Sequence, residues 1–482
     1  MIAGRVADRC IGFISIAILA RLLAPDDFGL IALAGAMVAV VEAIGAFSFD
    51  WVLVREEKLD RSKLDTAWTL RLIVDSVLAG LVVLGGFWAA GFYEDPRLEP
   101  VAWLLAFALM ISATENIGTV YFRREMVLEK EFLLRLSGKL AGFAVTIPTA
   151  FLLKNYWALL AGIVATKVTL VAMSYVMHPY RPWFSLERTR SLLSFSLWLQ
   201  FNSMIDLLRT RLPDFVIARA SGTQAVGLYS VANEIANLPS TELIAPINRA
   251  VYPGYAKQVV EHGPLAQTFL NVVGLIWSIA LPAAAGLAAV APLIVAILLG
   301  QKWLDAIPIL EVLVIAGAAF VLYTNVSYVF LAVGRPRLTT LMNVVTVALF
   351  VPGLLTLVPR MGPIGAAYAY TATALVMLPV SYVAVSLLLS LRPVQIIAAT
   401  WRPALSAMAM YLVVISVGEP DLTAGAIRLV PDLLLRVALG VVSYVAVLGG
   451  LWLACGRPPG AERTIIEFAR ERLRAVLLGA TP

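Results

Sequence analysis

The chain has 482 residues, of which 60% are hydrophobic and 14% are charged, and its formal net charge is +6. Soluble proteins are much less apolar, so this composition excludes most soluble enzymes and places the chain in a membrane. Its cysteines, Cys10 and Cys455, and its histidines, His178 and His262, are too few to suggest a disulfide framework, a metal centre or a histidine proton relay. We therefore expect no cofactor and no metal.

About fourteen apolar stretches follow one another, each near the ~20 residues that cross a bilayer as a helix. The stretches are continuous and rich in Leu, Ala and Val, which favours helices over the alternating segments of a β-barrel. This predicts an all-α integral membrane protein. The predicted spans are 4–23, 29–54, 69–92, 99–121, 132–153, 156–177, 190–212, 225–250, 267–290, 308–333, 338–359, 363–389, 401–418 and 433–455.

Lysine and arginine concentrate in alternate connections between the predicted spans. Residues 55–63, 123–135 and 181–190 each hold several, whereas the intervening connections mostly hold one, such as Arg97 or Lys154. Because basic loops stay on the cytoplasmic side of the membrane, both termini should be cytoplasmic. The alternation never breaks, which supports an even number of spans.

A repeat relates the two halves of the chain. Arg21 precedes Gly29 by eight residues, Arg219 precedes Gly227 by the same distance, and each pair closes one span and opens the next. The copies are six spans apart, so they should be parallel and related by an axis along the membrane normal. The expected organisation is an N-lobe at 1–178, a C-lobe at 179–395, two extra spans at 396–456 and a cytoplasmic tail at 457–482.

The tail differs in character from the spans. Apolar residues recur in it at helical spacing beside a group of arginines. This pattern is typical of a basic amphipathic helix on the inner leaflet. A loosely ordered helix in solvent is the alternative.

The seventh predicted span is the most highly charged. Asp206 and Arg209, and likewise Arg211 and Asp214, are three residues apart and can pair along a helix. They would form either a cationic cavity wall for pyrophosphate or acidic sugar, or self-neutralising pairs at the outer interface. Pro213 would break the helix beside them and free backbone groups for a substrate.

Other polar residues inside predicted spans complete the candidate site. Glu42, Asp75 and Glu234 are candidates for proton or sodium coupling, because carboxylates are the groups left for this role. For Glu42 and Glu234 the alternative is a hydrogen bond between helices. Asn233 and Asn343 are further substrate-cavity candidates. Glu115, Asn116 and Lys167 also lie within spans.

Several short segments carry a resemblance to a known family. They are Ala20–Leu30, Tyr121–Met126, Ile217–Gly222, Gly227–Ala232, Ala250–Lys257, Leu299–Trp303 and Gly334–Arg337. Their order and spacing resemble Wzx-type polysaccharide-unit flippases of the multidrug/oligosaccharidyl-lipid/polysaccharide exporter superfamily, with colanic-acid-type exporters most similar. The chain departs from that pattern in its short N-terminus and at Phe215, where relatives often have arginine after the aspartate.

The resemblance implies a bacterial inner-membrane protein that moves undecaprenyl-pyrophosphate-linked oligosaccharide from the inner to the outer leaflet. It implies alternating access between two six-helix lobes. The expected partners are this lipid-linked substrate, membrane lipids, a glycan polymerase and export machinery, and a coupling cation, with no nucleic acid.

Three other functions remain open. A small-molecule or drug antiporter of the same superfamily would share the fold, although the arginines of the seventh span would repel cationic drugs. A membrane glycan polymerase or ligase would need a catalytic outer loop, and every predicted outer connection is short. A structural scaffold would not explain the repeat or the charges within spans. No phosphate-binding loop is present, so direct ATP hydrolysis is not expected.

Overall fold

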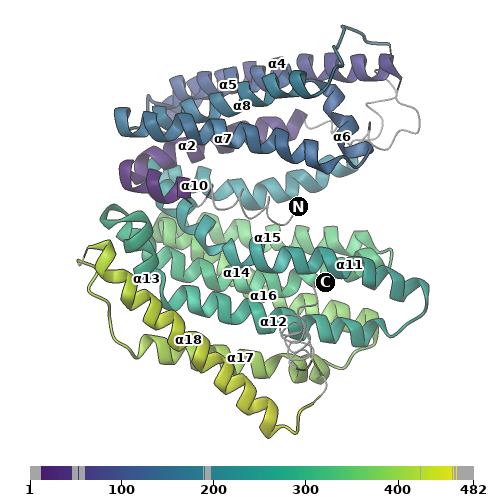
Figure 1. Cartoon of the computed structure of the whole chain (residues 1–482), viewed down its shortest axis with the longest axis vertical. Helices are drawn as coiled ribbons and strands as arrows, with labels where there is room; N and C mark the ends of the chain where they lie inside the picture. The colour runs from purple at the N-terminus through teal and green to yellow at the C-terminus, as the bar shows by residue number, and fades with distance from the viewer. Residues whose placement is uncertain are drawn as a thin grey trace, which may run out of the picture. The chain divides into compact units, whose positions relative to one another are not determined.

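A computed structural model describes residues 12, 14–45, 53, 60–187, 189, 197–423, 425–458, 460 and 463. Every regular element in these residues is a helix (Figure 1). The chain divides into two compact units, Met1–Ser230 (unit 1) and Val231–Pro482 (unit 2). The proposed lobe boundary at 178/179 stays a prediction, and the amphipathic tail helix falls almost wholly outside the described residues.

Unit 1 is built from long antiparallel helices. α4 packs against α5, and α7 packs against α8. Leu78, Val82, Ala102 and Ala106 fill the α4–α5 interface, and their burial is the main apolar contribution to that pairing. The helices of this unit are α2 (Pro25–Gly45), α4 (Arg61–Phe92), α5 (Leu98–Ala113), η1 (Ile117–Thr119), α6 (Val120–Arg124), α7 (Leu128–Leu153), α8 (Trp157–Met177) and most of α10 (Leu197–Ala236).

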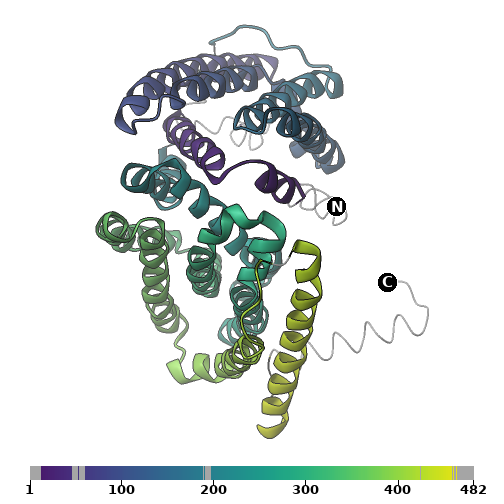
Figure 2. The same ribbon diagram turned by 90° about the vertical axis from the view of Figure 1, so that its left-hand side faces the viewer.

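In unit 2, α14 packs against α11, α12, α15 and α16. Figure 2 shows α18, the yellow helix, at the edge of this unit. In the apolar 18-residue segment of the stretch Gln301–Ala332, which contains α14, 67% of the residues are buried, whereas in that of α18 only 6% are, so most of α18 is left to lipid. The helices of this unit are η2 (Pro239–Ile244), α11 (Ala245–Val260), α12 (Leu265–Ala289), α13 (Ala291–Ile294), η3 (Val295–Leu299), η4 (Gln301–Ala306), α14 (Ile307–Ala332), α15 (Pro336–Met361), α16 (Pro363–Leu389), α17 (Pro393–Ile415) and α18 (Ala426–Ala454).

Within the described residues, nine helices are long and apolar enough to cross a membrane, or ten if a bent pair is one span. This confirms an all-α membrane protein. The prediction of fourteen spans remains untested, because this count covers the described residues only and the first predicted span is only partly described.

The predicted fourth span is broken. α5 and the segment Ile117–Arg124 meet at an angle of 66°. Between them, the Asn116 side chain accepts a hydrogen bond from the Gly118 amide (2.9 Å) and donates one to the Tyr180 carbonyl (2.8 Å). These bonds satisfy backbone groups that the break leaves outside a helix.

The seventh and eighth predicted spans meet within α10. The helix continues through Pro213, so the break predicted there was wrong. It lies instead at Gly222, whose φ of 81° is favourable only for glycine. The second half of α10 therefore starts at Thr223, as α2 starts at Pro25, the corresponding position in the predicted repeat.

Two repeat-related glycines lie against each other in unit 1. A Cβ atom on Gly29 would overlap the Thr223 carbonyl oxygen, and one on Gly227 would overlap the Pro25 carbonyl oxygen. Only glycine allows α2 and the second half of α10 to approach this closely.

Four connections of unit 1 gather beside this contact. Arg97 Nη1 lies 2.6 Å from Asp26 Oδ2, and the Thr223 hydroxyl donates to the same carboxylate. The Tyr156 amide donates to Asp27 Oδ1 at 3.0 Å. These polar contacts join the connections at one end of the unit, and the alternating topology predicts that this end faces outward.

The connection after α8 folds back onto α4. Asp65 accepts hydrogen bonds from the Tyr180 hydroxyl (2.5 Å) and the Trp183 amide (2.7 Å). Burial, and then repulsion by Lys130, lower the pKa of His178 below its usual value, which favours the neutral ring. Its Nδ1 accepts a hydrogen bond from the Tyr180 amide at 3.2 Å. The connection is thereby fixed to unit 1.

Candidate functional site

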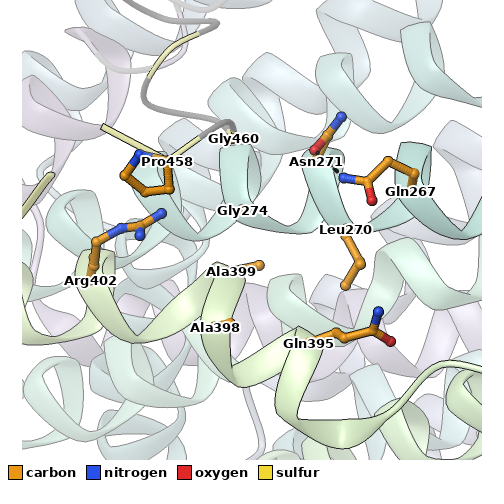
Figure 3. A pocket seen from close by; sticks show the side chains of 10 residues that line it. All are labelled: Gln267, Leu270, Asn271, Gly274, Gln395, Ala398, Ala399, Arg402, Pro458 and Gly460. Atoms are coloured by element: carbon orange, nitrogen blue, oxygen red, sulfur yellow. Dashed lines mark hydrogen bonds between the residues drawn. The ribbon is translucent and has the colours of Figure 1, made fainter. Parts of the chain in front are cut away.

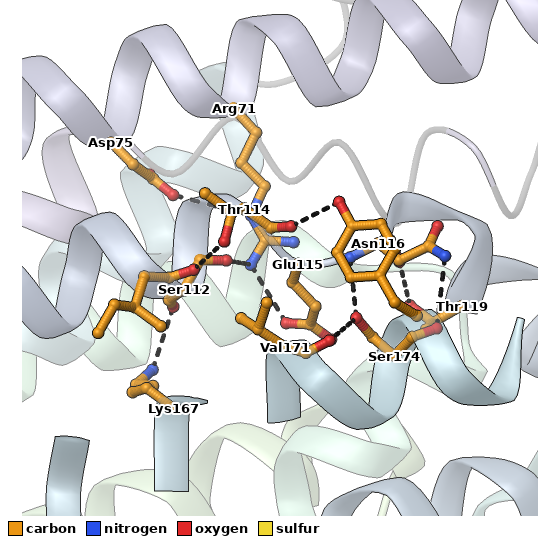
Figure 4. A network of polar contacts seen from close by, with 12 residues as sticks. Arg71, Asp75, Ser112, Thr114, Glu115, Asn116, Thr119, Lys167, Val171 and Ser174 are labelled. Atoms are coloured by element: carbon orange, nitrogen blue, oxygen red, sulfur yellow. Dashed lines mark hydrogen bonds and ion pairs between the residues drawn. The ribbon is translucent and has the colours of Figure 1, made fainter. Parts of the chain in front are cut away.

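The break after α5 holds a polar network inside unit 1 (Figure 4). Arg71 of α4 lies at its centre. One of its terminal nitrogens is 3.2 Å from the Ser112 carbonyl oxygen and 3.5 Å from the Glu115 carboxylate, and its Nε is 3.7 Å from Asp75. A single guanidinium thus bridges two carboxylates and the Ser112 carbonyl, which also accepts a hydrogen bond from the Glu115 amide at the end of α5.

Residues of α8 complete this network from the other side. Lys167 Nζ lies 3.4 Å from the Ser112 hydroxyl, and the Tyr175 hydroxyl donates to the Thr114 carbonyl at 2.9 Å. The Ser174 hydroxyl accepts a hydrogen bond from the Asn116 amide at 3.0 Å. The break is therefore held by side chains of neighbouring helices, in the manner of the discontinuous helices of transporters.

The network is partly accessible. The side chains of Arg71 and Glu115 are each 24% exposed, and that of Asp75 is 17% exposed. Asp75 also interacts electrostatically with Glu42 of α2 and with Lys167. The network therefore combines cations with carboxylates inside apolar helices, and its charged side chains keep some accessible area.

The charges of the seventh predicted span pair as the sequence indicates. Arg209 lies 2.7 Å from Asp206, and Arg211 lies 3.9 Å from Asp214. Asp214 is buried, whereas 46% of the Arg211 side chain is exposed. Both arginine side chains remain partly exposed although they are paired. The pairing by itself favours neither a cationic cavity wall nor self-neutralising pairs at the outer interface.

The remaining candidates lie on α2, on the last part of α10 and on α15. Glu42 is exposed on α2 and interacts electrostatically with Asp75 of the network. Asn233 and Glu234 lie at the end of α10 that belongs to unit 2, where the Asn233 side chain accepts a hydrogen bond from Asn237 at 3.0 Å. Asn343 is exposed on α15. Among the described contacts, none joins Asn233 to Asn343, so their shared role in a cavity stays a prediction.

Sequence reasoning missed Arg71 altogether, although Asp75 was a candidate. The available signal was the Arg71–Asp75 spacing of four residues, which places two opposite charges on one face of a helix. Glu115 and Lys167 were noticed as charges within spans, but the contacts that connect them, Glu115 with Arg71 and Lys167 with Ser112, could not be found from sequence alone.

A second polar cluster lies in unit 2. The Tyr255 hydroxyl donates to Asn325 at 2.9 Å, and Asn325 donates to Asn248 at 2.7 Å. All three side chains are buried. These buried polar groups hydrogen-bond to one another and hold α11 against α14, which explains their presence in the core.

The fold defines the class of protein. The chain is similar to the lipid II flippase MurJ in its inward closed conformation, with a TM-score of 0.77 and 13% identity over 94% of this chain and 99% of that one. It is also similar to an inward-facing multidrug resistance MATE family transporter of the MOP superfamily, with a TM-score of 0.61 and 16% identity over 79% and 95% of the two chains. The protein has the fold of these membrane exporters.

The sequence gives the family. Residues 18–308 match the model of the polysaccharide biosynthesis protein family, and the chain belongs to that family. It is 25% identical to the lipopolysaccharide biosynthesis protein WzxC of Escherichia coli K12 over 77% of this chain and 76% of WzxC. It is 26% identical to the teichuronic acid biosynthesis protein TuaB of Bacillus subtilis 168 over 60% and 61%. The resemblance to Wzx-type flippases is confirmed.

Proposed function

We propose that the protein is a flippase that moves undecaprenyl-pyrophosphate-linked oligosaccharide units from the inner to the outer leaflet for surface polysaccharide biosynthesis. The family and the likeness of the fold to a lipid II flippase support the proposal. The strongest structural support is the Arg71 network, which places positively charged side chains among apolar helices, where a charged substrate would need them.

The chemistry of the substrate explains why such a network is needed. A pyrophosphate that enters lipid loses its hydration, and this loss must be offset by fixed charges and hydrogen-bond donors. The planar fork of arginine binds two phosphate oxygens, which makes Arg71 the group best suited to receive it. Lys167, Arg209 and Arg211 supply further positive charge within unit 1.

The rival functions are less well supported. Cationic side chains oppose a cationic drug as substrate, although an antiporter shares the fold. The protein is a transporter and not an enzyme, because its curated relatives include the succinoglycan biosynthesis transport protein ExoT of Rhizobium meliloti 1021 and its fold is that of exporters. The proposal includes coupling to protons or sodium through Glu42, Asp75 and Glu234. It also includes cooperation with a polymerase and export machinery.

The proposed orientation places both termini in the cytoplasm of a bacterial inner membrane. In a variant without Cys10 and Cys455, a cysteine at Ser62 or Arg337 should be protected from an impermeant thiol reagent in intact cells, because positively charged connections stay inside. A cysteine at Lys154 should be labelled and serves as the control. Labelling at Ser62 or Arg337 from outside would reverse the orientation.

The cationic wall of α10 has its own test. Arg209→Ala or Arg211→Ala should reduce glycan export about tenfold or more at unchanged membrane abundance, because a lost phosphate contact costs ~1.5–3 kcal/mol. Arg209→Lys keeps the charge without the fork and should retain part of the activity. Arg428→Ala removes an exposed charge of the same sign elsewhere and is the matched control. Normal export by both alanine variants would favour simple interfacial pairing.

A further inference from the structure

A polar pocket lies in unit 2 where α12 and α17 begin (Figure 3). Its volume is about 210 Å³. Gln267 and Asn271 of α12 line one wall, and Gln395 and Arg402 of α17 line the other. Pro458 and Gly460, which follow α18, close a third side. No acidic residue is among the ten that line the pocket.

The hydrogen bonds on the walls leave the pocket rich in donors. The side-chain oxygen of Gln395, Oε1, accepts a hydrogen bond from the backbone amide of Arg392 at 2.9 Å. The side-chain NH₂ group of Gln395 therefore remains available as a donor. Gln267 Nε2 donates a hydrogen bond to Asn271 Oδ1 at 3.2 Å. The side-chain NH₂ group of Asn271 is therefore also a donor. The guanidinium of Arg402, a residue that is only 7% exposed, adds a cationic group to the wall.

The helix ends reinforce this preference for anions. Gln267 and Gln395 are each the third residue of their helix, and α12 packs against α17. The amino-terminal ends of two neighbouring helices therefore contribute partial positive charge beside the pocket. The ligand should be an anion with several acceptor oxygens, which describes a phosphate group.

The surroundings indicate a lipid as the source of that phosphate. The face of α17 next to the pocket exposes Val394, Ile397 and Leu405, with exposed fractions of 71%, 60% and 48%. Apolar side chains in these positions can contact acyl chains while a headgroup enters the pocket. The pocket is smaller than the ~300–1,000 Å³ of typical ligand sites, which fits a phosphodiester headgroup better than an oligosaccharide.

We propose that this pocket binds the phosphate of an anionic glycerophospholipid headgroup. The site is separate from the transport site, and only its assignment to the inner leaflet rests on the proposed orientation. Headgroup binding ties α12 to α17 and to the chain that follows α18, and so stabilises unit 2 where the two extra spans meet the bundle.

The test uses the full-length protein purified in detergent, with bound lipid measured by native mass spectrometry. Phosphatidylglycerol should be retained about tenfold more strongly than phosphatidylcholine, whose headgroup is zwitterionic. Gln395→Glu and Asn271→Asp keep the shape of the pocket but add negative charge, and each should reduce phosphatidylglycerol retention about tenfold. Gln395→Glu preserves the acceptor for Arg392 and favours the helix terminus, so the unfolding temperature of the lipid-free protein should not fall.

Two further arms complete the experiment. Arg337→Gln removes an exposed positive charge outside the pocket and should retain phosphatidylglycerol like the wild type. Inorganic phosphate in excess should not displace the lipid; displacement would keep the phosphate site but identify free phosphate as its ligand. Equal retention by wild type, Gln395→Glu and Asn271→Asp, or equal retention of the two lipids, would overturn the proposal.

Discussion

Arg71→Met should reduce glycan export to near background. The substitution removes the cation shared by Asp75 and Glu115 and leaves the Ser112 carbonyl without that donor. Removing the cation leaves two partly buried carboxylates without their partner, so a lower unfolding temperature is also expected. Arg71→Lys retains the charge but cannot bridge the same partners, and its export should be intermediate.

The chain offers a matched control on the same helix. Arg61 pairs with Asp65 at the same spacing and at the same distance as Arg71 with Asp75, 3.7 Å, but 71% of the Arg61 side chain is exposed. An exposed pair contributes roughly 0–1 kcal/mol, so Arg61→Met should transport normally. Similar losses in the two variants would mean that Arg71 has no special role.

A double variant separates substrate binding from stability. Arg71→Met with Glu115→Gln removes both charges of one pair and should recover part of the lost unfolding temperature, because one uncompensated carboxylate is gone. Export should stay low if Arg71 receives the pyrophosphate. Recovery of export together with stability would assign Arg71 a structural role.

Gly29→Ala should destabilise the protein sharply. The added methyl group would overlap the Thr223 carbonyl oxygen and lie 2.7 Å from the Gly227 amide nitrogen. Both are backbone atoms, which cannot move aside as the end of a flexible side chain can. Overpacking costs ~1–3 kcal/mol, and separating α2 from the second half of α10 would also disturb the Asp26–Thr223 hydrogen bond. Gly227→Ala should act in the same direction, since it meets the Pro25 carbonyl.

The control for this prediction lies two turns along α2. A Cβ atom on Gly35 would meet no atom within 4 Å other than those of the adjacent helix backbone. Gly35→Ala should therefore be neutral, or more stable by up to ~1 kcal/mol through helix propensity. Unfolding temperatures in detergent and membrane abundance measure both variants. Equal behaviour of Gly29→Ala and Gly35→Ala would contradict the close packing of the two helices.

Local patterns predicted much of the fold. The predicted span 363–389 coincides with α16, and 156–177 differs from α8 by one residue, because glycine, proline and tyrosine mark their ends. The pairs of Asp206 with Arg209 and Arg211 with Asp214 followed from helical spacing. Such features depend on residues close together in the chain, and the sequence displays them directly.

The breaks and the central network could not be predicted in the same way. Residues 99–121 form one apolar run, and the break within it is stabilised by Ser174 and Tyr180, about sixty residues further along the chain. Arg71 becomes a candidate only once α4, α5 and α8 are packed together. The predicted spans left residues 213–224 as a connection, and the break falls within it at Gly222, whereas Pro213 was mistaken for the breaking point.

The central claim is that the protein itself carries a pyrophosphate-linked glycan across the bilayer. Purified protein in proteoliposomes, supplied with undecaprenyl-pyrophosphate-linked oligosaccharide, should move the glycan to the opposite leaflet, as measured by its accessibility to an added glycan-cleaving enzyme. Arg71→Met should be inactive and Arg61→Met active at equal reconstitution. Imposed proton or sodium gradients should change the rate, and Gln or Asn at Glu42, Asp75 and Glu234 should remove that response. Glycan accessibility no greater than in protein-free liposomes, with or without a gradient, would contradict the claim.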